Sequence, residues 1–169
     1  MLSQLLPLKT QTTVMKKMTQ KVAVCLATSI FCSVFAANAQ TVSAEELKAQ
    51  MVKDWQRAKD YTLAYLNTMP ADKYSFHAVD STRSFAQQML HLSQGNYFLM
   101  MNASGQQPPA FAMTDMEHRA SAQTKDSVVY YVTNSYDFCI NAVQNSDIAK
   151  WGEKKQMFGM EATRLALMM

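Results

Sequence analysis

The sequence predicts an all-α protein built from amphipathic helices. Three long segments, near residues 43–69, 81–102 and 123–145, carry apolar residues at intervals of three and four. This spacing places side chains on one face of an α-helix. A shorter segment of the same character, Met160–Met169, closes the sequence. The length of 169 residues is compatible with one domain.

The first 39 residues have the pattern of a secretory signal peptide. Three lysines between residues 16 and 21 precede an apolar run over residues 22–36, and Ala37-Asn38-Ala39 supplies an A-x-A cleavage signal. The run is shorter than the roughly 20 residues that a membrane-spanning helix needs, so a membrane anchor is the weaker interpretation. Translation from Met1 and translation from Met15 are both compatible with this pattern.

Cleavage after Ala39 changes the charge of the chain. Four of the 16 Lys and Arg residues lie in residues 1–39, whereas all 13 Asp and Glu residues lie beyond them. The mature chain, residues 40–169, therefore has 12 basic and 13 acidic residues and a net charge of −1. No basic surface of the kind that nucleic-acid binding needs is left. We expect no nucleic-acid partner and no stable membrane span after cleavage.

The signal pattern predicts export, to the periplasm or as a secreted protein, and the cysteine content agrees with this. Cys139 is the single cysteine of the mature chain, so it cannot form an internal disulfide. The hydrophobic core must then hold the domain together even in an oxidising compartment. We interpret Cys139 as a small buried residue in a helix rather than as a catalytic thiol.

The first predicted helix covers residues 43–69. Ser43 and Glu46 can form a capping box, in which each side chain accepts a hydrogen bond from the backbone N–H of the other residue. Pro70 ends the helix because proline has no N–H and disfavours helical geometry in the preceding residue. The connector over residues 71–80 contains two aromatic side chains, which we expect to pack beneath the bundle.

The second predicted helix begins after a cap at Asp80 or Ser81, runs to about residue 102 and contains His91. A helical projection gathers its apolar residues into one broad face: Phe85, Met89, Leu90, Leu92, Tyr97, Leu99, Met100 and Met101. His91 lies outside this face and beside the small residue Gly95, so a ligand or another chain can approach the imidazole. His91 is therefore either a functional group at a cleft or a solvated side chain.

The third predicted helix covers residues 123–145. The run over residues 128–132 also suits a strand by β-propensity, but the length of the segment and its continuing helical period favour a helix. The other two histidines of the chain lie in connectors. His77 precedes the second helix, and His118 lies in a polar segment over residues 110–122. We expect both histidines at the surface, His118 in a solvated loop.

Residues 145–159 form a connector, after which Met160–Met169 begins a fourth amphipathic segment. This segment is shorter than the roughly 12–15 residues at which an isolated helix becomes even marginally stable. It also lacks a capping glycine. We therefore expect a domain whose fourth helix is truncated, so that the C-terminal part of the bundle is incomplete.

The sequence contains, in order, Trp55, YTLAYL at residues 61–66, MPADKYSF at 69–76 and RSFAQQMLHL at 83–92, followed by Asn96 and Tyr97. These motifs resemble the DinB-like (DinB/YfiT) superfamily. The resemblance covers about residues 43–147. It implies that residues 40–169 form a DinB-like domain with the architecture of an up-down four-helix bundle.

The resemblance also implies a divalent metal, zinc or nickel, held by three histidines. One lies on the second helix and two lie on the fourth. Only His91 matches one of these positions, because the other two would follow Met169 and neither His77 nor His118 aligns with them. A catalytic zinc-type site generally uses three protein ligands and keeps one position open for water or substrate. We therefore expect this chain to bind zinc or nickel weakly or not at all.

Three hypotheses for function follow. The chain is a member of a family of metal-dependent hydrolases and thiol transferases that acts on a small molecule, truncated before its last metal ligands. Alternatively, it is a non-catalytic exported bundle with a binding or structural role. In the third hypothesis it forms a homodimer, in which a partner covers the apolar surface left by the missing helix. The sequence has 14 methionines, and core packing explains six of them better than a soft-metal site does: Met100, Met101, Met157, Met160, Met168 and Met169.

Overall fold

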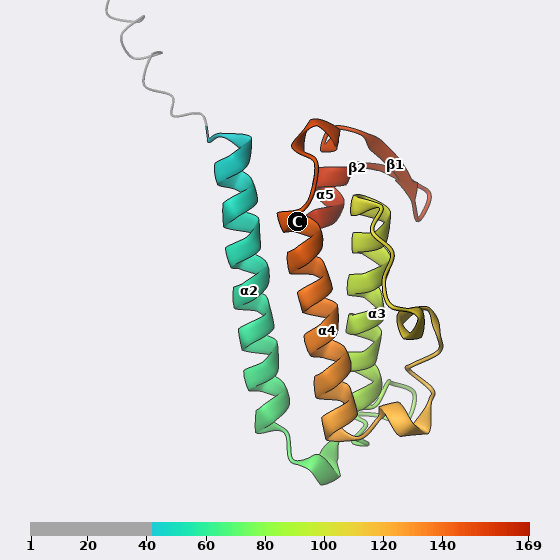
Figure 1. The fold of residues 1–169 in the computed structure, drawn as a ribbon. Helices are drawn as coiled ribbons and strands as arrows, with labels where there is room; N and C mark the ends of the chain where they lie inside the picture. Colours follow the sequence, from blue (N-terminus) through green and yellow to red (C-terminus); the bar gives the residue numbers. More distant parts are fainter. Residues whose placement is uncertain (1–41) are drawn as a thin grey trace, which may run out of the picture. The chain divides into compact units, whose positions relative to one another are not determined.

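The computed structural model describes residues 42–169, so the predicted signal peptide at residues 1–39 lies outside the described residues. The described chain is mostly helical (Figure 1). Its main elements are the helices α2 (Ala44–Thr68), α3 (Phe85–Ser104), α4 (Lys125–Gln144) and α5 (Arg164–Met168), and the strands β1 (Lys154–Met157) and β2 (Met160–Thr163). Across residues 42–169, none of the helices combines the length and the apolar character that crossing a membrane requires.

Helix α2 confirms the first predicted helix and its cap. The Ser43 side chain accepts a hydrogen bond from the backbone N–H of Glu46, and the Glu46 carboxylate accepts one from the backbone N–H of Ser43. The helix gives way to extended backbone at Met69, directly before Pro70. In the connector that follows, Tyr74 is buried as predicted, whereas Phe76 is exposed.

Helix α3 confirms the second predicted helix, but the predicted cap at Asp80 or Ser81 is wrong. The cap is Ser84, whose side chain accepts a hydrogen bond from the backbone N–H of Gln87, and the Gln87 side chain accepts one in return. The chain is still turning before this point, since the backbone N–H of Thr82 donates to the carbonyl of Val79. A reciprocal capping box at Ser84 satisfies two free N–H groups at the start of the helix.

Helix α4 confirms the third predicted helix over the strand alternative. Thr124 caps it by accepting a hydrogen bond from the backbone N–H of Ser127. One face of α4 is fully buried, and its apolar members include Val128, Val132, Cys139 and Val143. This regular burial over five turns explains why helical periodicity prevails over the β-propensity of residues 128–132.

Helix α4 packs against both α2 and α3 (Figure 1). Leu90 of α3 and Val132 of α4 share one core cluster, whereas Met100 and Val143, nearer the ends of the same helices, share the other. Helices α3 and α4 therefore run in the same direction. This corrects the predicted up-down order, because residues 105–124 form a long crossover that returns along the bundle before α4 begins.

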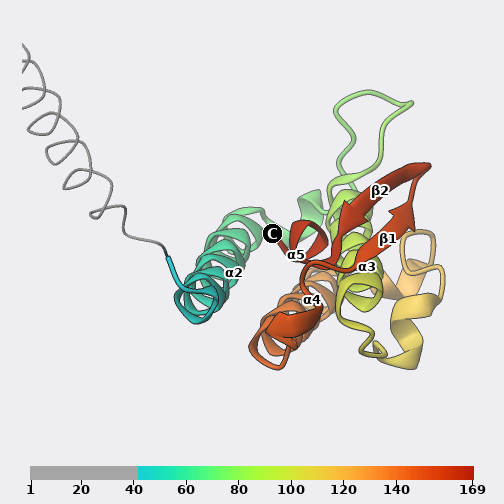
Figure 2. The same ribbon diagram turned by 90° about the horizontal axis from the view of Figure 1, so that it is seen from above.

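The C-terminal part differs from the predicted amphipathic segment. Residues 160–163 form a strand that pairs antiparallel with residues 154–157, and only α5 is helical (Figure 2). The fold is thus not purely α. The two-residue turn between the strands, Phe158-Gly159, has positive φ at both positions, which favours a hairpin over a continuing helix. Helix α5 is tied to α2 by the Trp55 indole, which donates a hydrogen bond to the carbonyl of Met168 at 2.8 Å.

Candidate functional site

His91 lies on the side of α3 that faces away from the core. The buried side of the helix passes through Leu90 and Tyr97, both almost inaccessible to solvent. Leu99, predicted on the buried face, is instead exposed and lies on the same side as His91. This side of α3 therefore combines an imidazole with apolar side chains, a combination typical of ligand pockets rather than of a solvated helix face.

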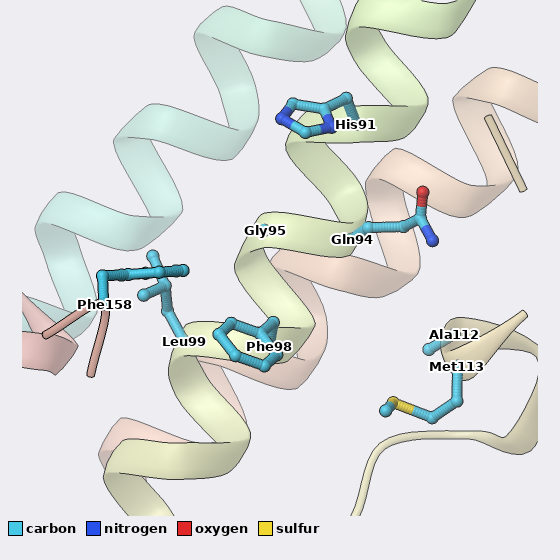
Figure 3. Close-up of a pocket in the computed structure, with 8 residues that line it drawn as sticks. All are labelled: His91, Gln94, Gly95, Phe98, Leu99, Ala112, Met113 and Phe158. Atoms are coloured by element: carbon cyan, nitrogen blue, oxygen red, sulfur yellow. The ribbon is translucent and has the colours of Figure 1, made fainter. Parts of the chain in front are cut away.

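A pocket of about 530 Å³ lies beside His91 and is open to solvent. Its wall comes from α3, from the crossover and from the turn of the hairpin (Figure 3). The lining residues are His91, Gln94, Gly95, Phe98, Leu99, Ala112, Met113 and Phe158. Apart from His91 and Gln94 these residues are apolar or lack a side chain. Gly95 has no heavy atom within 4 Å of the position that a Cβ would occupy, so the wall is open there.

A buried carboxylate orients the imidazole. Glu117 lies in the crossover with 8% exposure, and its Oε2 lies 3.1 Å from Nδ1 of His91. Its other oxygen accepts a charge-assisted hydrogen bond from Nε of Arg83. The backbone carbonyl of Glu117 accepts a hydrogen bond from the side-chain amide of Gln123. When His91 is neutral and donates from Nδ1, its Nε2 lone pair is free to accept a proton, a hydrogen bond or a metal ion.

Glu117 was not predicted as a site residue, because residues 110–122 were expected to form a solvated loop. This segment contains two short 3₁₀ helices and buries Ala112, Met116 and Ala122 together with Glu117. The close spacing of Phe111, Met113 and Met116 could have predicted that this segment packs against the helices. Such a density of large apolar side chains is unusual for a solvated loop.

The other two histidines do not join His91. Nδ1 of His77 lies 2.8 Å from the carbonyl oxygen of Thr82, in the connector before α3. His118 is exposed and contacts Asp115 at 2.9 Å, and this hydrogen bond lowers the pKa of the Asp115 carboxyl. Both histidines are at the surface, as the sequence predicted.

The described residues do not fit a complete catalytic metal site. Within residues 42–169, no three His, Cys, Asp or Glu side chains are grouped so that they could hold a metal ion. Glu117, the carboxylate beside His91, is already held by Arg83. One imidazole falls short of the three protein ligands that a catalytic zinc-type site generally uses.

Cys139 offers no alternative chemistry. Its thiol is fully buried in α4, and burial raises its pKa to about 12. A thiol held in its protonated form is a poor nucleophile. The interpretation of Cys139 as a small buried helix residue is confirmed.

Comparison of the chain with known protein families, with curated proteins and with solved structures gives no match, so the resemblance to the DinB-like superfamily stays a prediction.

Proposed function

We propose that the chain is a DinB-like bundle protein that binds a small ligand in the pocket beside His91. The observation that carries this proposal is the position of the imidazole, which lines an apolar pocket of about 530 Å³ and is oriented by Glu117. Concave, mostly apolar sites of this size with a few fixed polar groups are typical of small-molecule binding.

A pocket-filling substitution tests the proposal. Phenol, chosen as a small probe with an apolar body and one polar group, is titrated into the mature chain while backbone amide shifts are recorded by NMR. We expect saturable shifts at residues 94–99 that disappear in Gly95→Leu. The substitution places a side chain in the open space beside His91, and it replaces a glycine inside a helix with a better helix former. The fold should therefore survive it.

Gly152→Leu is the matched control. Gly152 is exposed, lies outside the pocket and also has no heavy atom within 4 Å of an added Cβ. This variant should bind phenol as the wild type does. Absence of saturable shifts at residues 94–99 in the wild type, or equal binding by Gly95→Leu and the wild type, would overturn the proposal.

A metal-dependent hydrolase or thiol transferase is the second candidate function. The observation that favours it is the hydrogen bond between Nδ1 of His91 and Glu117, since metal-bound histidines commonly donate their other ring nitrogen to a carboxylate. The test is the zinc or nickel retained by the purified mature chain after desalting, compared with His91→Ala and, as control, His77→Ala. Stoichiometric metal that His91→Ala alone loses would show the metal site that this second function requires, and absence of such metal would contradict it.

The proposal includes export of the mature chain, on the strength of the pattern in residues 1–39. Expression of the full sequence in a bacterium should release a periplasmic or secreted protein whose N-terminus is Gln40. Retention of an uncleaved chain in the cytoplasm would contradict export.

Homodimerisation is a further proposal, supported by exposed apolar residues such as Phe98 and Phe158. Sedimentation equilibrium of the mature chain distinguishes monomer from dimer.

A further inference from the structure

We infer that the pocket beside His91 binds a ligand that combines an aromatic ring with a hydrogen-bond donor, and that Phe158 holds the ring against Phe98. This inference rests on the proposed function and specifies the ligand class of the same site. Three features carry it: the backbone conformation of Phe158, the arrangement of apolar side chains around it, and the hydrogen-bonding state of the two polar residues in the wall.

Phe158 occupies a position that does not favour phenylalanine. It is the first of two turn residues between β1 and β2, with φ of 52°, and Gly159 follows with φ of 76°. Hairpin turns with positive φ at both positions prefer Asn-Gly or Asp-Gly. A bulky residue in the left-handed region costs about 1–2 kcal/mol. The requirements of the turn therefore do not explain this side chain.

Exposure of the ring adds to this cost. Phe158 is 76% exposed, although it is among the largest apolar side chains of the chain. Its ring lies 5.8 Å from the ring of Phe98, which is itself 41% exposed, with an angle of 44° between their planes. Two tilted and solvent-exposed rings at the mouth of a pocket offer a third ring the offset and edge contacts that aromatic groups prefer. A ligand ring would bury both of them.

The other apolar side chains of the wall suit the same occupant. Leu99 lies beside Phe158, and Met113 approaches from the crossover on the other side of Phe98 (Figure 3). Met113 is 60% exposed. A thioether makes favourable contacts with aromatic ring edges and adapts its shape to what it covers. The aromatic and sulfur-containing side chains of this wall favour a flat ring over a branched aliphatic group.

The polar groups of the wall present hydrogen-bond acceptors. Nδ1 of His91 lies 3.1 Å from the Glu117 carboxylate, so a neutral ring that donates from Nδ1 presents Nε2 as an acceptor. The side-chain amide nitrogen of Gln94 donates a hydrogen bond to the carbonyl of Thr114 at 2.9 Å. The side-chain carbonyl oxygen of Gln94 can then accept a hydrogen bond from a ligand. A ligand that brings a hydroxyl or amine donor satisfies these acceptors, whereas one that lacks a donor leaves them unpaired.

Three probes of similar size test the need for an aromatic ring and the need for a hydrogen-bond donor separately. Phenol carries both a ring and a donor, toluene carries only the ring, and cyclohexanol carries only the donor on an aliphatic body. Titrations followed at the amides of residues 94–99 should give a phenol affinity about fivefold or more above that of either other probe, as expected for the loss of one hydrogen bond or one set of ring contacts. Equal affinities for phenol and toluene, or for phenol and cyclohexanol, would overturn the inference.

Phe158→Asn separates a ligand contact from a structural role. Asparagine followed by Gly159 is a preferred sequence for this turn, so the variant should unfold at the wild-type temperature or above it. Its affinity for phenol should nevertheless fall about fivefold or more. Phe76→Asn, which removes an exposed aromatic ring outside the pocket, should bind phenol normally.

The outcomes distinguish this inference from the proposed function. If no probe binds the wild type at residues 94–99, both fail. If the probes bind and Gly95→Leu abolishes binding, but Phe158→Asn binds phenol as tightly as the wild type, the binding function stands and the role of Phe158 is wrong.

Discussion

Glu117 and His91 are 26 residues apart in the sequence, yet Oε2 of the carboxylate lies 3.1 Å from Nδ1 of the imidazole. The crossover over residues 105–124 brings the carboxylate back along α3 and buries it there. The orientation of His91 therefore depends on a connecting segment and not only on its own helix. This contact links the topology of the fold, with α3 and α4 in the same direction, to the chemistry of the pocket.

Glu117→Ala should change the tautomer of His91. When the wild-type ring is neutral, the carboxylate should keep the proton on Nδ1. Without it, the Nε2–H form should increase, which ¹⁵N NMR of the ring nitrogens measures directly. Asp115→Ala removes the carboxylate beside the exposed His118 and is the control. An unchanged His91 spectrum in Glu117→Ala would show that the carboxylate does not orient the ring.

Ser84→Ala should destabilise the protein by about 1 kcal/mol, because it removes the side chain that caps α3. Ser81→Ala removes a hydroxyl of the same kind, but Ser81 is exposed and does not cap the helix. It should change the free energy of unfolding by less than about 0.5 kcal/mol. Urea denaturation of both variants measures the difference. A larger loss of stability in Ser81→Ala than in Ser84→Ala would show that Ser81 caps the helix, as predicted from the sequence.

Leu90→Ala should cost about 2–5 kcal/mol, because Leu90 is fully buried and its removal leaves a cavity. Leu99→Ala should cost less than about 1 kcal/mol, since Leu99 is 37% exposed at the pocket. Equilibrium unfolding in urea compares the two. Similar losses at both positions would mean that the buried face of α3 includes the side on which His91 lies.

The positions of the long helices could be predicted because each one carries its own signals. The Ser43–Glu46 capping box and Pro70 bound α2 within a few residues, and the buried face of α4 repeats over five turns. The direction of α4 could not be predicted, because it depends on a 20-residue crossover whose packing involves contacts distant in sequence. The hairpin was missed because Met160–Met169 fits a helical period as well as a strand.

The candidate site was predicted only in part. A helical projection separates His91 from the core side chains and places it beside Gly95, and both residues line the pocket. The projection assigned Leu99 to the core, because a stripe of apolar residues does not reveal which of its edges is buried. Glu117 and Phe158 come from other segments of the chain, so the periodicity of α3 contains no information about them.

Cys139 should make the stability of the protein fall at alkaline pH. Burial raises the pKa of its thiol from the ordinary 9 to about 12, so the folded state keeps a proton that the unfolded chain releases. The contribution of this thiol is therefore complete below about pH 9 and is lost as the pH rises toward 12. Between about pH 8 and pH 10 the wild type should lose roughly 1–2 kcal/mol more than Cys139→Ala. Urea denaturation at each pH measures the free energy of unfolding. If the wild type and Cys139→Ala lost equal stability over this range, burial would not raise the pKa of the thiol.

Trp55→Phe should loosen α5 from α2. The indole N–H of Trp55 donates to the carbonyl of Met168 at 2.8 Å, and its ring meets Tyr136 edge-on at 5.9 Å. Phenylalanine keeps an aromatic ring against Tyr136 but cannot donate, so the buried carbonyl loses its partner at a cost of about 1–3 kcal/mol.

Hydrogen exchange locates this effect. Trp55 packs against both core clusters, but Trp55→Phe removes only its hydrogen bond to Met168. Amides of residues 164–168 should therefore exchange faster, whereas those of Val128 and Val132, near the start of α4, should keep their protection. Trp151→Phe is the matched control. Its indole also donates a hydrogen bond, but to Ser146, five residues away in the sequence. Trp151 packs in the same core cluster as Met168, but Trp151→Phe keeps the hydrogen bond from Trp55 to Met168. Residues 164–168 should therefore exchange more slowly in Trp151→Phe than in Trp55→Phe, and equal exchange there in the two variants would contradict this assignment.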